Sequence, residues 1–335
     1  MAIKIAVIGT GTVSRDNYIP YLAIQPDVEL GYYNRTQSTA VQVAKEYGGE
    51  VFSSLESLVN WEPTAAMILT SETVRYEIGM QVIKGGVPKV FFEKPLVAVH
   101  GQAHVDEDDF HKGKEMLNLA AERGCETAMV FNYRFFEQTL AARKAATERN
   151  FGQVINAAGL VHYACWSHCI DLIQHFAGNV AEITALSGQM EHSAPIVNIQ
   201  APDVVAALRM ENGATGTLIG TAGMSWQHPL YELILTFENG RIHMRDLDGT
   251  LEILDGAGQS HESRSLVRHT SRWDQYKDSF KKSLDAYLHS LRHEQAPPVP
   301  GIAGLQELQV EAALKRSIAQ KRPVLLQQEF PITSQ

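Results

Sequence analysis

Disulfide chemistry, membrane insertion and nucleic-acid binding all find little support in this sequence. Its 335 residues include only three cysteines, Cys125, Cys165 and Cys169, which are too few and too clustered for a disulfide framework. Such sparse use of cysteine is typical of a reducing compartment, and we expect a cytoplasmic location. No run of about 18 or more apolar residues occurs, so we expect neither a transmembrane helix nor a membrane partner.

Basic residues are also in the minority. The chain has 29 lysines and arginines against 38 aspartates and glutamates, which gives a formal net charge of -9. This balance argues against nucleic acid as the main partner, because a phosphate backbone is bound by clustered positive charge. Apolar residues make up 44% and charged residues 20%, as in an ordinary globular protein. The length favours two domains, and a small molecule is the partner class that stays open.

The first part of the chain alternates strand-like and helix-like segments. Short β-rich runs cover residues 3–8, 28–33, 65–69, 90–92 and 126–130. Amphipathic segments of helical length lie between them at residues 39–47, 54–59, 74–84 and 114–123. This βαβ rhythm predicts a parallel sheet with helices on both faces. We therefore expect an α/β protein whose N-terminal Rossmann domain covers residues 1–131.

The second part of the chain has more strand-length runs and fewer helix-length segments than the first. Strand-length runs cover residues 154–161, 183–190, 204–210, 214–219, 231–237 and 241–245. The turns at 211–213 and 238–240 both end in Asn-Gly, which favours β-hairpins. We expect an α/β domain over residues 132–335, with a large open, mostly antiparallel sheet and one helix at 165–177. The final helix, residues 305–320, is the element that can pack back near the first domain.

A glycine-rich turn follows the first strand. It reads Gly9-Thr10-Gly11-Thr12-Val13-Ser14 and leads into a helix. Glycines at this point allow a tight turn and let the backbone approach a pyrophosphate, which the free N–H groups of the next helix then bind. A lone Gly-x-Gly is a weak signal, but its place in a βαβ unit predicts a dinucleotide site.

The choice between NAD and NADP depends on the end of the second strand. An acidic residue about 20 residues after the glycine turn would bond the ribose 2′-hydroxyl and repel a 2′-phosphate. This chain has Asn34 and Arg35 there, and an arginine pairs with phosphate in a bidentate way. We expect NADP in preference to NAD. The alternative is that Arg35 is a solvated loop residue.

A lysine comes directly after an apolar strand in Phe91-Phe92-Glu93-Lys94-Pro95. Ligands of parallel sheets bind at the carboxyl ends of the strands. Proline keeps the residue before it out of the helical region and so fixes the direction in which Lys94 leaves the strand. An ammonium held there can bond a substrate hydroxyl and carry or stabilise a transferred proton. The alternative is an ordinary lysine on a surface turn.

The helix expected at 165–177 carries a narrow polar arc. At about 100° per residue, His168, Asp171 and His175 share this arc, and Cys165 and Cys169 fall on the apolar side. Because the thiols and the imidazoles do not converge, we expect no metal site here. The polar arc is consistent with the wall of a cleft.

These motifs, taken together and in this order, resemble one family. After the glycine turn and Glu93-Lys94-Pro95, the chain carries Asn132-Tyr133-Arg134-Phe135 and His168-Cys169-Ile170-Asp171. With the closing stretch 304–324 they resemble the glucose–fructose oxidoreductase, inositol dehydrogenase and rhizopine-catabolism (Gfo/Idh/MocA) family over nearly the whole chain. The resemblance implies hydride transfer to or from a sugar, polyol or related alcohol, and a homodimer or homotetramer packed through the open sheets.

The resemblance also implies roles for individual residues. In that family the lysine of the Glu-Lys-Pro turn contacts both the nicotinamide cofactor and the substrate hydroxyl, which carries over to Lys94. Glu93 beside it and Thr70 at an earlier strand end are expected at the cofactor. Thr70 is followed by Ser71 where the family usually has proline.

The catalytic histidine of the family corresponds to His168, which is expected to act as an acid/base. The family often has an aspartate four residues earlier, and this chain has Ala164 there. We therefore expect Asp171 or Tyr163 to orient His168 in its place.

Two other functions stay open on sequence grounds. Some relatives of this fold hold NAD tightly, oxidise the substrate transiently and cleave a glycosidic bond without net redox change. Others resemble a galactose-regulon repressor and act as non-catalytic dinucleotide sensors that bind a partner. Ala164 favours the second alternative, whereas Lys94 and His168 count against it.

Overall fold

The structure, a computed structural model, describes residues 2–194, 199–223, 229–247, 249–265 and 271–332. The chain divides into two compact units. Unit 1 comprises Met1–Phe131 and Phe280–Leu308, and unit 2 comprises Asn132–Ser279 and Gln309–Ile332. Residues 280–308, which the sequence analysis assigned to the C-terminal domain, thus group with the N-terminal residues.

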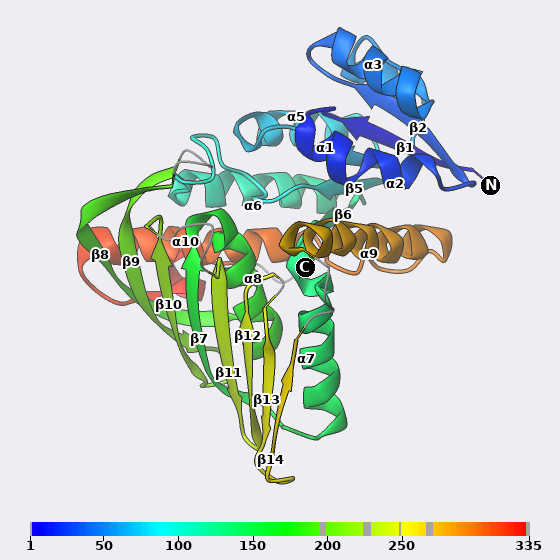
Figure 1. Cartoon of the computed structure of the whole chain (residues 1–335). Coiled ribbons are helices and arrows are strands. Elements are labelled where there is room, and N and C mark those ends of the chain that lie inside the picture. Colours follow the sequence, from blue (N-terminus) through cyan, green and yellow to red (C-terminus); the bar gives the residue numbers. More distant parts are fainter. Residues whose placement is uncertain (1, 195–198, 224–228, 248, 266–270, 333–335) are drawn as a thin grey trace. The chain divides into compact units, whose positions relative to one another are not determined.

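Unit 1 is built on a six-stranded parallel sheet in the order β3-β2-β1-β4-β5-β6 (Figure 1). The strands are β1 (Ile3–Ile8), β2 (Val28–Tyr33), β3 (Glu50–Val51), β4 (Ala65–Ile68), β5 (Lys89–Phe92) and β6 (Glu126–Met129). All four residues of β4 are buried, and five of the six in β1 are. Strands covered on both faces need such near-continuous apolar runs. The Rossmann fold expected from the βαβ rhythm is confirmed.

Helices connect these strands. They are α1 (Thr12–Asn17), α2 (Ile19–Ala23), α3 (Gln37–Tyr47), α4 (Leu55–Val59), α5 (Glu72–Lys84) and α6 (Glu107–Glu122). Helix α6 begins seven residues before the predicted start at residue 114, because a capping box joins Asp106 to Asp109. The acidic side chains of Glu107, Asp108 and Asp109 in the first helical turn also stabilise the helix N-terminus.

Each of two long helices has residues in both units. Helix α9 (Arg272–Arg292) has its last part in unit 1, and so does the first part of α10 (Ile302–Gln320). In unit 1, α9 packs by its aromatic rings: Phe280 lies 5.2 Å from Tyr18 and Tyr287 lies 4.9 Å from Phe91, centroid to centroid. Among the described residues, no helix has the length and apolar character that crossing a bilayer requires.

Unit 2 is built on a nine-stranded sheet in the order β14-β13-β12-β11-β7-β10-β9-β8-β15. Its strands are β7 (Val154–His162), β8 (Val180–Ala194), β9 (Ile199–Met210), β10 (Thr215–Thr221), β11 (Tyr231–Phe237), β12 (Gly240–Arg245), β13 (Leu251–Asp255), β14 (Ser260–Arg264) and β15 (Val324–Leu325). Only β7 and β10 pair in parallel; every other neighbouring pair of these strands is antiparallel. The predicted mostly antiparallel sheet and both predicted hairpins are confirmed.

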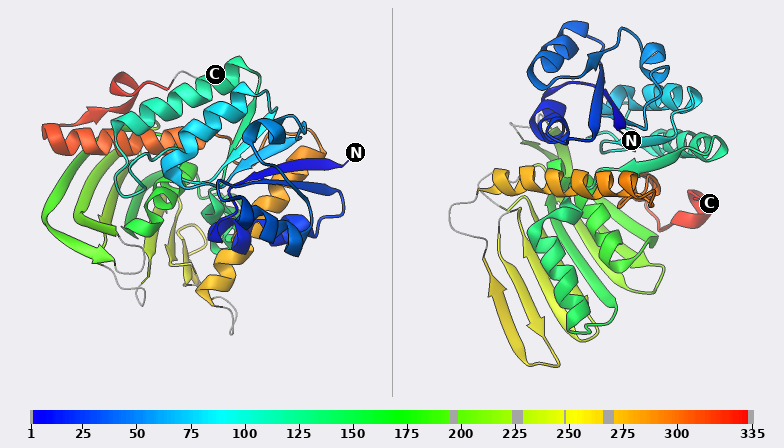
Figure 2. Two further views of the ribbon diagram at one scale, coloured as in Figure 1. Left: turned by 90° about the horizontal axis from the view of Figure 1, so that it is seen from above. Right: turned by 90° about the vertical axis from the view of Figure 1, so that its right-hand side faces the viewer.

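One face of this sheet is covered by helices α7 (Glu137–Glu148) and α8 (Trp166–Ala177), the green helices of Figure 2. Helix α8 lies close to β7 because Gly159 has no side chain: a Cβ there would meet Cys169 Sγ at 3.0 Å. On the opposite face, Leu186 is 71% exposed and Val205 is 47% exposed. The second sheet is therefore open on one side, as expected.

Candidate functional site

The glycine turn of unit 1 has the backbone geometry that a phosphate-binding turn needs. Gly9 has φ of 98°, and a Cβ there would lie 2.9 Å from the backbone of Leu69 and Thr70. Any other residue would be strained and would clash. A Cβ on Gly11 would meet no protein atom within 4 Å, so the turn is open on that side. Thr12 and Val13, also in this turn, are exposed.

Three hydroxyl groups near this turn support the fit to a dinucleotide. The side-chain oxygens of Thr10, Ser14 and Thr70 are buried and have no hydrogen-bond partner among the described residues. Buried polar groups are normally satisfied. A phosphate or ribose oxygen would supply the missing partners, so the residues present fit the group that the motif predicts.

Asn34 and Arg35 have different tasks at the end of β2. Asn34 accepts a hydrogen bond from the backbone N–H of Thr10 at 3.1 Å and donates one to the carbonyl of Thr36 at 3.0 Å. Its side chain thus braces the glycine turn from the neighbouring strand. Arg35 is exposed and has no hydrogen bond or ion pair to any described residue. Its guanidinium is therefore available to a ligand.

The Glu93-Lys94-Pro95 turn at the end of β5 is held by hydrogen bonds of the buried Glu93 side chain. The Glu93 carboxylate, 8% exposed, accepts hydrogen bonds from the Tyr18 hydroxyl at 2.8 Å and from the Lys94 backbone N–H at 2.7 Å. One carboxylate oxygen thus bonds to the turn and the other to Tyr18, so Glu93 acts as a brace. The Lys94–Pro95 peptide bond is cis. The Lys94 ammonium is partly exposed and donates to Gln102 Oε1 at 3.1 Å.

Arg75 is a second brace, which the sequence analysis missed. It lies on α5, is 3% exposed, and donates to the backbone carbonyls of Thr70 and Pro95, the former at 2.7 Å. It thereby ties together the turns that follow β4 and β5. Burial lowers the pKa of Arg75, and the nearby carboxylates of Glu93 and Glu72 partly offset this effect. No pattern in a single sequence marks such an arginine, because its partners are backbone atoms.

In unit 2, His168 lies inside the packed part of α8. It is 2% exposed, and its ring stacks on that of Tyr133 with centroids 3.9 Å apart and planes 4° apart. The Tyr133 hydroxyl in turn lies 3.0 Å from Cys165 Sγ. Burial raises the pKa of Tyr133 well above its ordinary value. The imidazole plane is therefore fixed by a neutral ring.

The two residues expected to orient His168 are engaged elsewhere. The Asp171 carboxylate forms a bidentate ion pair with Arg134, with Nε–Oδ2 of 2.9 Å and Nη2–Oδ1 of 2.5 Å. Burial raises the pKa of Asp171, and the guanidinium opposes this shift. The Tyr163 hydroxyl donates to the carbonyl of Pro202 at 2.6 Å. The structure thus does not bring Asp171 or Tyr163 into a hydrogen bond with His168.

His175, the third residue of the polar arc, faces cations. Arg143 Nη1 lies 3.1 Å from its Nε2 atom. Burial, with Arg134 and Arg143 nearby, lowers the pKa of His175 to about 3. This side chain is therefore neutral at physiological pH. Cys165 and Cys169 are both buried, and the described residues contain no group of three or more His, Cys, Asp or Glu that could hold a metal ion.

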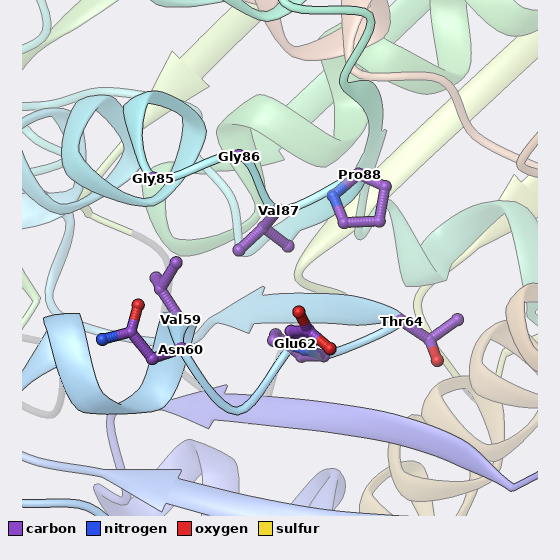
Figure 3. Close-up of a pocket in the computed structure, with 9 residues that line it drawn as sticks. Val59, Asn60, Glu62, Thr64, Gly85, Gly86, Val87 and Pro88 are labelled. Atoms are coloured by element: carbon purple, nitrogen blue, oxygen red, sulfur yellow. The ribbon is translucent and has the colours of Figure 1, made fainter.

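A pocket of 670 Å³ in unit 1 lies away from these residues (Figure 3). Its walls are the segment 59–64, which precedes β4, and the segment 85–88, which precedes β5. It therefore opens at the amino ends of the parallel strands, whereas ligands of such sheets bind at the carboxyl ends. Glu62 is the one ionisable residue in its lining. This pocket does not fit the dinucleotide or the chemistry of Lys94.

Solved structures of similar fold extend over almost the whole chain. An oxidoreductase from Agrobacterium radiobacter, in complex with NAD+, L-tartaric acid and magnesium, is 15% identical with a TM-score of 0.80, over 97% of this chain and 99% of that one. The WlbA dehydrogenase from Bordetella pertussis, in complex with NADH and UDP-GlcNAcA, is 19% identical with a TM-score of 0.74, over 97% of each chain. A levoglucosan dehydrogenase, in complex with NADH and levoglucosan, is 15% identical with a TM-score of 0.78, over 97% and 99%.

The parallel sheet of unit 1, with its glycine turn and buried hydroxyls, defines a dinucleotide-binding protein. Family models then identify it further. Residues 3–131 match the oxidoreductase family with NAD-binding Rossmann fold, and residues 147–326 match the C-terminal alpha/beta domain of the same family. The chain belongs to the Gfo/Idh/MocA oxidoreductase family, as the motifs predicted, and is a nicotinamide-dependent oxidoreductase. A comparison with curated proteins gave no significant match.

Proposed function

We propose that this enzyme transfers hydride between a nicotinamide cofactor and a carbinol or carbonyl carbon of a sugar, cyclitol or related polyol. The observation that carries the proposal is the fixed Lys94 turn at the carboxyl end of β5, in the same sheet edge as the glycine turn. The bound sugars of the WlbA and levoglucosan dehydrogenase structures support the substrate class.

The protein's part in this reaction is to bind, orient and exchange a proton. The nicotinamide supplies the hydride chemistry when it is bound. The turn from Gly9 to Val13 holds the pyrophosphate, with the buried hydroxyls of Thr10 and Thr70 as additional partners. The Lys94 ammonium donates a hydrogen bond to the substrate oxygen, which stabilises negative charge as the hydroxyl proton leaves.

His168 is the proposed acid/base that exchanges this proton. Its ring plane is set by Tyr133. Asp171 and Tyr163, which were expected to orient it, form no hydrogen bond with it. Asp171 pairs with Arg134, and Tyr163 donates a hydrogen bond to the carbonyl of Pro202. Ala164 offers no polar group, so the acid/base pair usual in the family is absent at this position.

For the cofactor we propose a preference for NADP over NAD. Arg35 is exposed and unpaired among the described residues, and no acidic residue follows β2 to repel a phosphate. A guanidinium there can donate two parallel hydrogen bonds to the 2′-phosphate. Asn34 contributes indirectly, because its amide fixes the turn that binds the pyrophosphate.

We further propose a homodimer or homotetramer that packs through the open face of the second sheet. The strand register places Leu186, Val205, Ile219 and Leu160 side by side across β8, β9, β10 and β7. Leu186, Val205 and Ile219 are 71%, 47% and 36% exposed, and this contiguous aliphatic row supports the proposal. Sedimentation at micromolar concentration tests this, and a monomer would contradict it.

A thermal-shift panel of NAD, NADP and their reduced forms, each with sugars and cyclitols, tests the function. A ligand that binds only the folded protein raises Tm with its occupancy. We expect stabilisation by a dinucleotide, a further shift with one sugar or polyol, and a change in nicotinamide absorbance with that pair. Saturable cofactor binding without turnover on any of them would favour the non-catalytic sensor. A cofactor that stays bound and is not consumed while a glycoside is cleaved would favour the non-redox reaction.

A further inference from the structure

The loop between β5 and α6 brings an uncharged acceptor to the ammonium of Lys94. Gln102 Oε1 accepts a hydrogen bond from Lys94 Nζ at 3.1 Å. We propose that Gln102 is a positioning residue, which directs the Lys94 ammonium towards the reacting oxygen of the substrate. The inference rests on the proposed function of Lys94.

The loop is anchored at Gln102 and in the residues before it. Its backbone N–H donates to Glu72 Oε1 in the first turn of α5, at 3.3 Å. Before it, the N–H of Val99 donates to Asp109 Oδ1 of α6 at 2.8 Å. The turn itself is closed by Gly101, which has φ of 89° and donates to the carbonyl of Ala98 at 3.0 Å. Gln102 is thus presented from a fixed backbone, which limits the entropy lost when its side chain holds Lys94.

The chemistry of the pair suits a proton-handling lysine. An ammonium group has three donors, and a single bond to Gln102 fixes its rotation while two donors stay available. Because an amide carries no charge, it orients the ammonium without holding it in an ion pair. The carboxylates of Glu93 and Glu72 have other partners: Glu93 binds Tyr18 and its own turn, and Glu72 binds the loop backbone. The Arg75 guanidinium also lies near the carboxylates of Glu93 and Glu72.

Three variants separate positioning from a merely structural role. Gln102→Leu keeps the size and removes the acceptor, Gln102→Glu keeps the acceptor and adds charge, and His104→Ala changes an exposed side chain of the same loop as the control. For Gln102→Leu we expect kcat to fall by about ten- to a hundredfold with cofactor Kd unchanged, since a misplacement of ~1 Å costs up to about a hundredfold. For Gln102→Glu we expect the pH profile of kcat to move about one unit or more to higher pH, because an opposite charge within ~4–6 Å favours the ammonium.

A second measurement tests the contact between Gln102 and Lys94 without relying on enzyme activity. Reductive methylation of the apoprotein over a pH series, followed by mass spectrometry of the Lys94 peptide, reports how readily this amine loses its proton. We expect half-maximal methylation at higher pH in Gln102→Glu and faster methylation in Gln102→Leu, with Tm of each variant near that of the parent. Identical methylation curves in all variants would overturn the inference. If Lys94→Ala kept full activity while these curves still differed, the contact would stand and the proposed function would fail.

Discussion

The guanidinium of Arg134 forms a bidentate ion pair with the carboxylate of Asp171, with Nε 2.9 Å from Oδ2 and Nη2 2.5 Å from Oδ1. The two side chains are 15% and 2% exposed. Arg134 belongs to the 3₁₀ turn Asn132–Phe135 at the start of unit 2, and Asp171 lies in the middle of α8. The pair therefore ties this turn to the helix that carries His168.

Removing one partner of this pair should strongly destabilise the protein. Asp171→Leu leaves the Arg134 charge without its counterion in a mostly buried site, which costs about 3–5 kcal/mol of unfolding free energy. The double variant Arg134→Met/Asp171→Leu should lose less than the single one, because no uncompensated charge stays behind. Urea denaturation of both proteins measures this. A double variant that is less stable than Asp171→Leu would contradict the expectation.

Lys94→Ala should lower kcat/KM by about a hundredfold or more, the usual scale for a positioned proton carrier. The fold should stay intact, since the turn is braced by Glu93 and Arg75 through backbone groups. Lys84→Ala at the exposed end of α5 is the matched control and should behave as the parent. Steady-state kinetics with the substrate found in the panel decide the matter. Near-normal turnover of Lys94→Ala would reduce this lysine to a structural turn.

Arg35→Ala should remove most of the preference for NADP over NAD. A charge-assisted hydrogen bond to a phosphate contributes about 1.5–3 kcal/mol, and NAD lacks the group that receives it. Calorimetric titration of both cofactors into both proteins gives the two Kd ratios. The control is the NAD affinity itself, which should not change. Equal affinities of the unmodified protein for NAD and NADP would rule out the role of Arg35.

Much of the fold could be predicted because it depends on local patterns. The first strand, the βαβ rhythm and the Asn-Gly hairpins were all found from hydrophobic periodicity and turn residues. Helix α7 and the edge strand β14 were missed, since both are rich in polar residues and have weak periodicity. Residues 280–308 lie within the second domain by position in the chain but cluster with residues 1–131 in the structure, because aromatic contacts such as that of Phe280 with Tyr18 are not visible in a sequence.

The site was less predictable than the fold. The motifs proposed Gly9, Lys94 and His168 as site residues, and the spacing on α8 suggested that Asp171 faces His168. In the structure Asp171 faces Arg134, a residue 37 positions away. Arg75 and Gln102 gave no signal, because one binds backbone carbonyls and the other lies in a loop without a motif. Long-range pairing decides such contacts, and a helical wheel cannot supply it.

Acid should destabilise the protein through His175. In the folded state its pKa is lowered to about 3, whereas the ordinary value is 6.5. The unfolded chain therefore takes up a proton first, so stability present above about pH 6.5 is lost as the pH falls towards 3. His175→Gln should flatten the decline of Tm between neutral pH and mild acid. His261→Gln, at an exposed position of β14, should not. Parallel Tm curves for parent and His175→Gln would contradict this.

His168 is the residue whose role most needs a direct test, because it is buried and neither Asp171 nor Tyr163 forms a hydrogen bond with it. If it is the acid/base, a limb of the pH profile of kcat/KM should disappear in His168→Asn together with most activity. Loss of the stacked ring in Tyr133→Leu should lower kcat by less and keep the limb, since the imidazole stays present but less well oriented. Tyr133→Phe is the matched control, because it keeps the stack and loses only the contact of the hydroxyl with Cys165.

The three variants of this last experiment also distinguish chemistry from packing. A histidine that only fills space would give His168→Asn and Tyr133→Leu similar losses of Tm and an unchanged pH limb. A catalytic histidine would separate the two measurements, with a large loss of rate at a modest loss of stability. Ala164→Asp is a fourth variant, which adds a carboxylate four residues before His168. This carboxylate would stabilise the charged imidazole and should move the limb of the pH profile to higher pH. If the limb of the pH profile stays in place in His168→Asn, with a rate within a few fold of the parent, Lys94 and not His168 would be the residue that carries the proton.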